Sequence, residues 1–191
     1  MNDYISKLKK YCNYDFDYEI LGNYLRIRVD NETSYEYDME RCDISIYERG
    51  EKRNIGRWSD KKISDYVFAS RMKNTFGGGI DYGDSTLFEE ASTLQELNEL
   101  LKERFDTSLF SVGSIEEKKL SLMDNEGSYK IVYSYNDDIK VIEESDDREF
   151  VFGRFYNEIV YQEYFNKKLS EYTSVFEIGF TEDEIRCILH R

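Results

Sequence analysis

The chain has 191 residues, 40% of them hydrophobic, and its 40 Asp and Glu against 26 Lys and Arg give a net charge of −14. A chain of this length buries a sizeable core, and 12 Phe with 17 Tyr are too many aromatic residues for a disordered protein. The apolar runs are too short for a membrane span, and the first residues do not read as a signal peptide. We therefore expect a cytoplasmic protein with no membrane partner.

The net charge is unevenly distributed along the chain. Residues 1–76 carry 14 basic and 14 acidic side chains, whereas residues 77–191 carry 12 basic and 26 acidic ones. An uneven charge distribution produces an asymmetric electrostatic field, which steers and selects charged partners. The acidic C-terminal part is therefore the better candidate for a partner-facing surface.

Helical spacing of apolar residues predicts a helix over residues 4–12. Alternation of apolar and polar residues then predicts a strand around residues 24–29, after a Gly22-Asn23 turn, and strands around 35–40 and 44–46. A second helix is expected to begin at Ser59.

A glycine-rich segment, residues 77–84, follows where the charge balance changes, and four glycines predict a flexible loop there. Beyond it, Thr93 and Glu96 form a capping box before an amphipathic helix. Strands are expected at 109–112, 118–123, 129–135 and 138–143, a long helix over 153–172, and a last helix over 181–189.

Runs of strands bounded by helices predict an α+β fold with antiparallel sheets flanked by helices. No proline-rich or glycine/serine-rich linker divides the chain, so we expect residues 1–191 to form one compact unit. The order helix, strands, helix occurs twice, in 1–76 and 85–175, which favours two similar halves joined by loop 77–84. Gly56-Arg57-Trp58 and Gly153-Arg154-Phe155 match at an offset of about one hundred residues, but such short matches also arise by chance in a chain of this composition.

Motifs for catalysis are scarce. The single histidine is His190, so Ser-His-Asp catalysis, Cys-His catalysis and a histidine metal site are not expected. Gly77-Gly78-Gly79 lacks the Lys and Ser/Thr of a phosphate loop. Cys12, Cys42 and Cys187 form neither a disulfide framework nor a CxxC metal site, which favours reduced thiols. We therefore expect that the protein is not an enzyme and binds no cofactor or metal. The alternative is a hydrolase that uses the acidic pairs of residues 137–149 as catalytic groups.

Tyrosines mixed with carboxylates predict a partner-binding surface, because tyrosine is enriched at interfaces and carboxylates attract Lys and Arg. The alternative is that alternating tyrosines pack within a sheet. The candidate residues are Tyr35, Glu36, Asp38, Tyr133, Tyr135, Asp137, Asp138, Glu143, Glu144, Asp146 and Asp147.

A basic segment, residues 49–73, holds eight Lys and Arg against three acids and includes Trp58, the only tryptophan. A basic patch with an aromatic residue is typical of nucleic-acid binding. A molecule with a net charge of −14 repels phosphate, however, so no nucleic-acid partner is expected. We expect this segment to dock on acidic groups of the chain or of a partner.

The stretch Gly56-Arg57-Trp58-Ser59-Asp60 stands before a helix in a small, acidic, tyrosine-rich and histidine-poor α+β chain. In this general character the whole chain resembles the immunity proteins of bacterial polymorphic toxin systems. The resemblance implies a protein that binds a cognate basic toxin domain, often a nuclease, and occludes its active site. An acidic chaperone or adaptor for a secreted effector domain and a DNA-mimic inhibitor are the alternatives, and the oligomeric state stays open.

Overall fold

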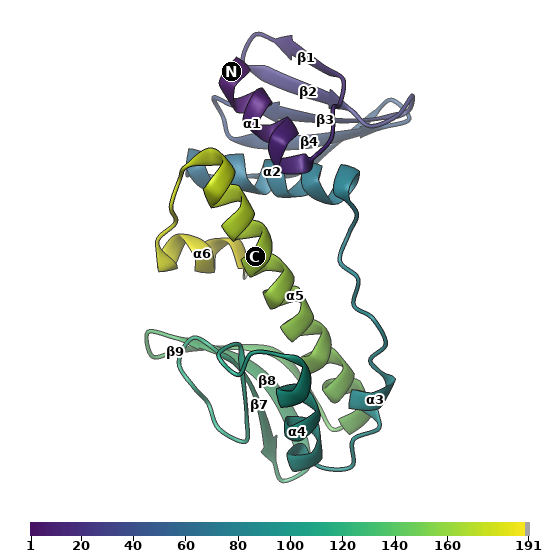
Figure 1. Cartoon of the computed structure of the whole chain (residues 1–191), viewed down its shortest axis with the longest axis vertical. Helices are drawn as coiled ribbons and strands as arrows, with labels where there is room; N and C mark the ends of the chain where they lie inside the picture. Colours follow the sequence, from purple (N-terminus) through teal and green to yellow (C-terminus); the bar gives the residue numbers. More distant parts are fainter. Residues whose placement is uncertain (190–191) are drawn as a thin grey trace. The chain divides into compact units, whose positions relative to one another are not determined.

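The computed structural model describes residues 1–189 and divides the chain into two compact units. Unit 1 comprises Met1–Ile80 and the chain from Lys167 onward, and unit 2 comprises Asp81–Asn166. The predicted α+β class is confirmed (Figure 1). Helix α5 (Arg148–Phe176) contributes to both units.

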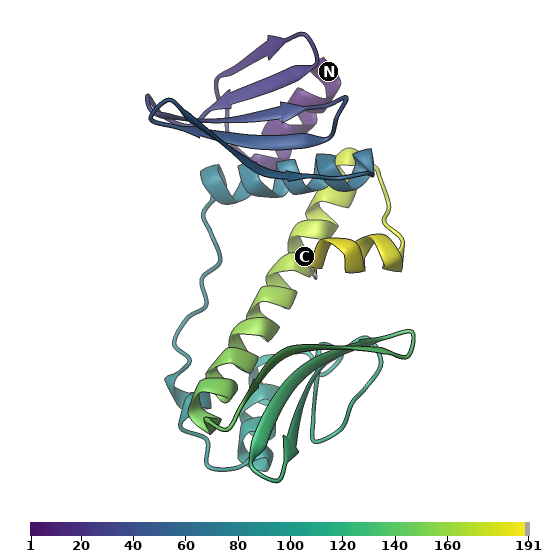
Figure 2. The ribbon, with the colours of Figure 1, turned by 180° about the vertical axis from the view of Figure 1, so that it is seen from behind.

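Unit 1 contains an antiparallel sheet whose five strands follow their order in the sequence. Figures 1 and 2 show helices α1 and α2 against the same face of this sheet. The elements are α1 (Asn2–Cys12), β1 (Tyr18–Leu21), β2 (Tyr24–Arg28), β3 (Thr33–Asp38), β4 (Asp43–Glu48), β5 (Glu51–Arg57), α2 (Lys61–Gly77) and α6 (Glu182–Leu189).

The core of unit 1 lies between this sheet and its helices. Leu25, Tyr37 and Ile44 are direct neighbours on three adjacent strands, and each is fully buried. Helix α2 begins after Asp60, because the Asp60 carboxylate accepts a hydrogen bond of 3.1 Å from the Ile63 N–H. The helix therefore begins two residues later than expected.

Unit 2 has a four-stranded sheet with the order β6-β7-β8-β9. Strand β6 runs parallel to β7, unlike the antiparallel pairs that were expected, because residues 113–119 carry the chain back before β7 begins. The elements are α3 (Thr86–Glu89), α4 (Leu94–Arg104), β6 (Phe110–Val112), β7 (Leu120–Asn125), β8 (Ser128–Tyr135), β9 (Asp138–Ser145) and the first part of α5.

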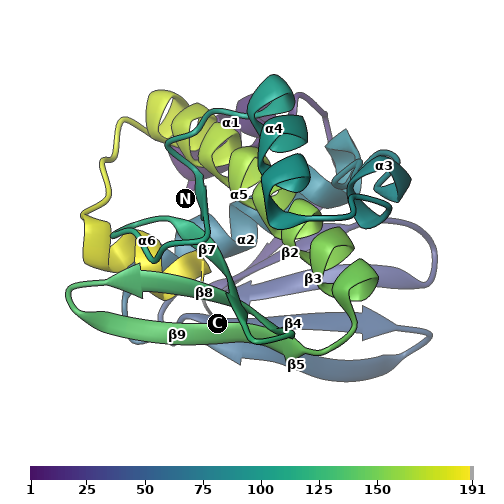
Figure 3. The same cartoon turned by 90° about the horizontal axis from the view of Figure 1, so that it is seen from below.

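The core of unit 2 lies between this sheet and helices α4 and α5 (Figure 3). Leu120 and Ile131 are buried on the sheet, and the ring of Phe110 contacts Phe155 of α5 with centroids 6.4 Å apart. Helix α5 begins at Arg148, five residues earlier than expected, because the Asp147 carboxylate accepts a hydrogen bond from the Phe150 N–H.

Strands β1 and β5 and the short helix α3 were not expected. Strand β5 is largely charged and exposed, so it lacks the alternation that marks a half-buried strand. Its Gly56 lies under the Trp58 ring, and a Cβ there would come within 2.7 Å of that ring. Both units show a helix, a run of strands and a second helix in this order, α1 to α2 and α4 to α5. Whether they are duplicates stays a prediction.

Candidate partner-binding surface

The hairpin of β8 and β9 in unit 2 holds most of the predicted binding residues. Its two-residue turn places Asn136 and Asp137 at φ angles of 50° and 63°, the left-handed conformation that tight hairpins require. Glu117 anchors the turn, because its carboxylate accepts hydrogen bonds from the Asn136 N–H at 2.6 Å and from Ser134 Oγ at 3.1 Å. Hydrogen bonds therefore hold in place the turn that carries Asp137.

The carboxylates of this hairpin and of Asp146 and Asp147, which connect β9 to α5, differ in their accessibility and their roles. Asp137, Asp138, Glu144, Asp146 and Asp147 are exposed, and Glu143 is half-buried. Glu144 pairs with Lys130 on β8 at 2.9 Å, while Asp147 caps α5. The Asp147 side chain thus has a structural role besides its charge.

The two tyrosines predicted for the same surface lie largely inside unit 2. Tyr133 and Tyr135 are only 8% and 6% exposed, on the face of β8 that also carries Ile131. All five residues from Ile131 to Tyr135 are buried, and the absence of charge in this run could have indicated it. Contact with a partner by these rings stays a prediction, but little of either ring is accessible.

Tyr35, Glu36 and Asp38 belong to unit 1 and point to opposite faces of its sheet. Tyr35 is half-buried on the inner face, where it pairs with Ile46. Glu36 is buried on the outer face between Arg26 and Lys52, whose side-chain nitrogens lie 2.9 and 2.8 Å from its carboxylate. Burial by itself raises the pKa of Glu36, but the hydrogen bonds from Lys52 and Arg26 outweigh it and leave the pKa below its ordinary value.

Asp38 closes the turn between β3 and β4. Its carboxylate accepts hydrogen bonds from the backbone N–H groups of Glu40 and Arg41 at 3.1 and 3.0 Å. Burial raises the pKa of Asp38, and these backbone donors together with the Tyr24 hydroxyl lower it below its ordinary value. The charges of Glu36 and Asp38 are therefore largely compensated within unit 1.

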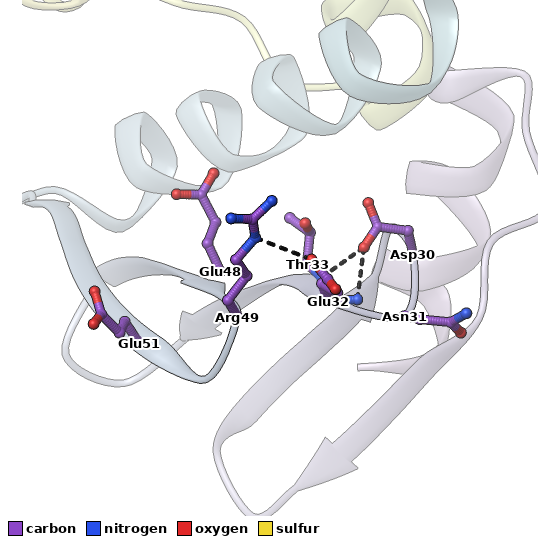
Figure 4. Close-up of a pocket in the computed structure, with 7 residues that line it drawn as sticks. All are labelled: Asp30, Asn31, Glu32, Thr33, Glu48, Arg49 and Glu51. Carbon is purple, nitrogen blue, oxygen red and sulfur yellow. Dashed lines mark hydrogen bonds and ion pairs between the residues drawn. The ribbon is translucent and has the colours of Figure 1, made fainter.

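The surface of unit 1 is hollowed in several places. A cavity of about 340 Å³ on the outer face of the sheet is lined by Glu36, Asp38 and Asp43 together with Lys52. A larger, open hollow of about 890 Å³ lies beside the turns before β3 and after β4 (Figure 4). Its lining residues are Asp30, Asn31, Glu32, Thr33, Glu48, Arg49 and Glu51.

The hollow in Figure 4 is acidic and is shaped by its two turns. Asp30 accepts hydrogen bonds from the N–H groups of Glu32 and Thr33 at 2.8 and 2.7 Å. Arg49 donates a hydrogen bond of 3.1 Å to Glu32. The polar side chains of Asp30, Glu32 and Arg49 are thus hydrogen-bonded within the two turns at the surface. The hollow therefore offers negative charge but no buried polar group that could bind a small ligand.

The basic segment, residues 49–73, is neutralised within unit 1. Seven of its eight Lys and Arg lie within 4 Å of a carboxylate of the same unit, among them Lys61 with Asp65 at 2.8 Å and Lys62 with Glu184 at 2.6 Å. Trp58 is only 8% exposed, which leaves little of its ring for stacking on a base. The acidic groups on which this segment was expected to dock are therefore present in unit 1 itself.

The two units differ strongly in net charge. Unit 1 holds 18 Lys and Arg against 19 Asp and Glu, a balance of −1. Unit 2 holds 8 against 21, a balance of −13. Nearly all of the net charge therefore belongs to unit 2, which also carries the β8–β9 hairpin.

Groups for other chemistry are sparse in the part of the chain that the structure describes. Among residues 1–189 no group of three or more His, Cys, Asp or Glu is arranged to hold a metal ion. No helix in this range is both long and apolar enough to cross a bilayer. His190 lies outside the described residues.

Sequence reasoning missed one feature of the hairpin. Ile139 and Val141 of β9 are 49% and 50% exposed in the midst of the carboxylates. Their alternation with Asp138 and Lys140 is visible in the sequence and agrees with the strand expected at 138–143, but alternation does not show whether the apolar face of a strand is covered. No protein-family model, curated protein or solved structure matches the chain.

Proposed function

We propose that this chain is an immunity-type binding protein that neutralises a cognate basic toxin domain in the cytoplasm. The observation that carries the proposal is the charge of unit 2, −13, with three exposed carboxylates on an anchored hairpin and two more directly after it. Such a surface attracts Lys and Arg from a distance and speeds association.

Inhibition requires that the hairpin cover the cationic residues with which the toxin holds its substrate. Carboxylates of Asp137, Asp138, Glu144 and Asp146 would pair with these cations, so that substrate is excluded by occupancy and by charge. A toxin that acts on nucleic acid has such a basic surface, because the phosphate backbone dominates binding. We therefore expect the partner to be a nuclease domain.

The test pairs this chain with the basic C-terminal domain of a large secreted protein encoded by the neighbouring gene. Co-expression should restore growth, and calorimetry should show binding that weakens as salt is raised. The variant Asp137→Asn/Asp138→Asn/Glu144→Gln/Asp146→Asn should weaken binding at least about tenfold, or about 1.4 kcal/mol. It leaves the α5 cap at Asp147 intact.

A matched control neutralises four other exposed carboxylates of unit 2, Glu90, Glu99, Glu103 and Glu126, each as Glu→Gln. Equal loss with both variants would mean that net charge alone acts and would reject the hairpin as the binding surface. Full affinity with both variants would overturn the proposed function. Binding of an unfolded effector segment without growth rescue would favour a chaperone, and binding of several unrelated DNA-binding proteins would favour a DNA mimic.

A further inference from the structure

Strand β9 is an edge strand with an open side. It pairs only with β8 in the four-stranded sheet. Ile139 and Val141 stand on the same face of β9 and are about half exposed, 49% and 50%. An edge strand with exposed apolar side chains is a template on which another chain can add a strand.

The backbone of the same two residues faces the open side. The two-residue turn makes Tyr135 and Asp138 the closing hydrogen-bonded pair, and pairs alternate from there. Ser134, the partner of Ile139, uses its carbonyl on the opposite side, where it accepts a hydrogen bond of 2.8 Å from the Lys118 N–H. The N–H and C=O groups of Ile139 and Val141 therefore point away from β8.

Carboxylates flank this segment at both ends. Asp137 precedes it at the turn, and Glu144 and Asp146 follow it. The register shifts between Val141 and Glu143, which ends the regular segment at Val141. Residues 138–141 thus form a short regular edge between two acidic ends.

We propose that the edge of β9 at residues 138–141 binds an extended, basic segment of the partner by strand addition. Apolar side chains of this segment would pack on Ile139 and Val141, and Lys or Arg at its ends would pair with the flanking carboxylates. Main-chain hydrogen bonds supply affinity and the side chains supply specificity in this mode. The inference rests on the proposed function, because it names the part of the basic partner that this hairpin recognises.

A second copy of this chain is a poorer occupant. Antiparallel pairing of β9 with β9 would bring two clusters of carboxylates together, and like charges across strands are destabilising. A basic segment relieves the same repulsion, and this charge complementarity decides between the two occupants.

The chain offers a matched control in unit 1. Ile20 of the edge strand β1 is 41% exposed and pairs with Leu25, one position from a closing pair, Leu21 with Tyr24, at a two-residue turn. Ile20 and Ile139 therefore occupy equivalent places on their hairpins. Carboxylates also stand beside this edge, but Asp15 is paired with Lys9, and Glu19 lies within 4 Å of Arg26 and Arg28. The edge of β1 therefore carries less uncompensated negative charge than the edge of β9, in a unit with a balance of only −1.

The probe is a synthetic peptide in which Val and Thr alternate between Lys-Arg ends, added to the full chain. Amide hydrogen exchange read by NMR should slow at Ile139 and Val141 by about tenfold or more, while Ile20 is unchanged. The same peptide with Glu at its ends, and a peptide N-methylated at alternate residues, should give no protection, because they lack the charges and the donors.

A second test changes the edge strand of the protein and measures its affinity for the same peptide. Ile139→Pro removes an outward N–H that the β8–β9 ladder does not use, so we expect the hairpin to fold and peptide affinity to fall at least about tenfold. Ile20→Pro should bind as the native chain does. Protection at Ile20, no protection at Ile139, or equal binding of the N-methylated peptide would overturn the inference; a dimer that Ile139→Pro abolishes would identify a second copy as the occupant.

The toxin domain separates this inference from the proposed function. Loss of toxin binding in the four-carboxylate variant with full binding in Ile139→Pro would overturn strand addition and leave the proposed function standing. Full binding in both variants would overturn the proposed function itself.

Discussion

The Tyr37 hydroxyl donates a hydrogen bond of 2.6 Å to Oδ1 of Asp65 and so ties the inner face of β3 to α2. Ser64 Oγ lies 2.7 Å from the same hydroxyl, and the Tyr37 ring stacks on Phe68 with centroids 4.9 Å apart. Burial, followed by the Asp65 charge, raises the pKa of Tyr37 well above its ordinary value. This tyrosine is therefore a neutral donor inside unit 1.

Tyr37→Phe should lower the free energy of unfolding by about 1–2 kcal/mol, because it removes a buried hydrogen bond to a charged acceptor. Urea unfolding measures the change. The control is Tyr35→Phe on the same strand, whose hydroxyl makes no hydrogen bond within residues 1–189. Equal stability of the Tyr37→Phe and native chains would show that this hydrogen bond contributes nothing.

Glu36→Gln should destabilise unit 1 at neutral pH by about 1–3 kcal/mol, because Arg26 and Lys52 lose a charged acceptor. The pKa of Glu36 is lower in the folded chain than in the unfolded chain. Its contribution is therefore present above the unfolded pKa and is lost as pH falls through the folded pKa. Urea unfolding at pH 7 and at pH 3 should show the difference from the native chain shrinking, and the exposed Glu51→Gln should show no such trend.

Lys168→Met should stabilise unit 1 below pH 8, because removal of the buried charge should outweigh loss of the hydrogen bond that Lys168 Nζ donates to Asn74 Oδ1. Lys168 is only 5% exposed, and burial, together with the charge of Lys73, lowers its pKa to about 8. Between pH 8 and the higher pKa of the unfolded chain, the unfolded state binds more protons, so the native stability rises with pH. The gain from Lys168→Met should accordingly be largest below pH 8 and should shrink toward pH 10.

Thermal unfolding across this pH range measures the effect of Lys168→Met. The exposed neighbour Lys167→Met is the control and should show no comparable trend. A gain that is independent of pH would mean that better packing, and not the buried charge, causes it.

The three thiols should differ sharply in reactivity. Cys12 and Cys42 are buried, and Cys187 on α6 is exposed. Burial raises the pKa of Cys12 to about 12, against smaller opposing effects of Lys73 and Lys168. Ellman's reagent at pH 8 should therefore label one thiol rapidly in the native chain and all three in denaturant, and Cys187→Ser should remove the rapid phase. Rapid labelling of Cys12 would contradict its burial.

Helix ends and hairpin turns could be predicted from short stretches of sequence. Thr93 with Glu96 marks the start of α4, and the Gly22-Asn23 turn joins β1 to β2, because capping and turn chemistry act over a few residues. Strand β5 could not be predicted, because an exposed edge strand has no apolar side to alternate with a polar one.

The sequence by itself determined the α+β class, the reduced and widely spaced cysteines and the acidic C-terminal part, since these follow from composition and local pattern. Only the tertiary structure decided that Tyr133 and Tyr135 turn inward while Ile139 and Val141 stand exposed. Alternation shows that a strand has two faces, but which face meets a helix depends on packing between distant segments. The same packing placed seven cations of residues 49–73 beside carboxylates of unit 1 and left unit 2 with almost all of the net charge.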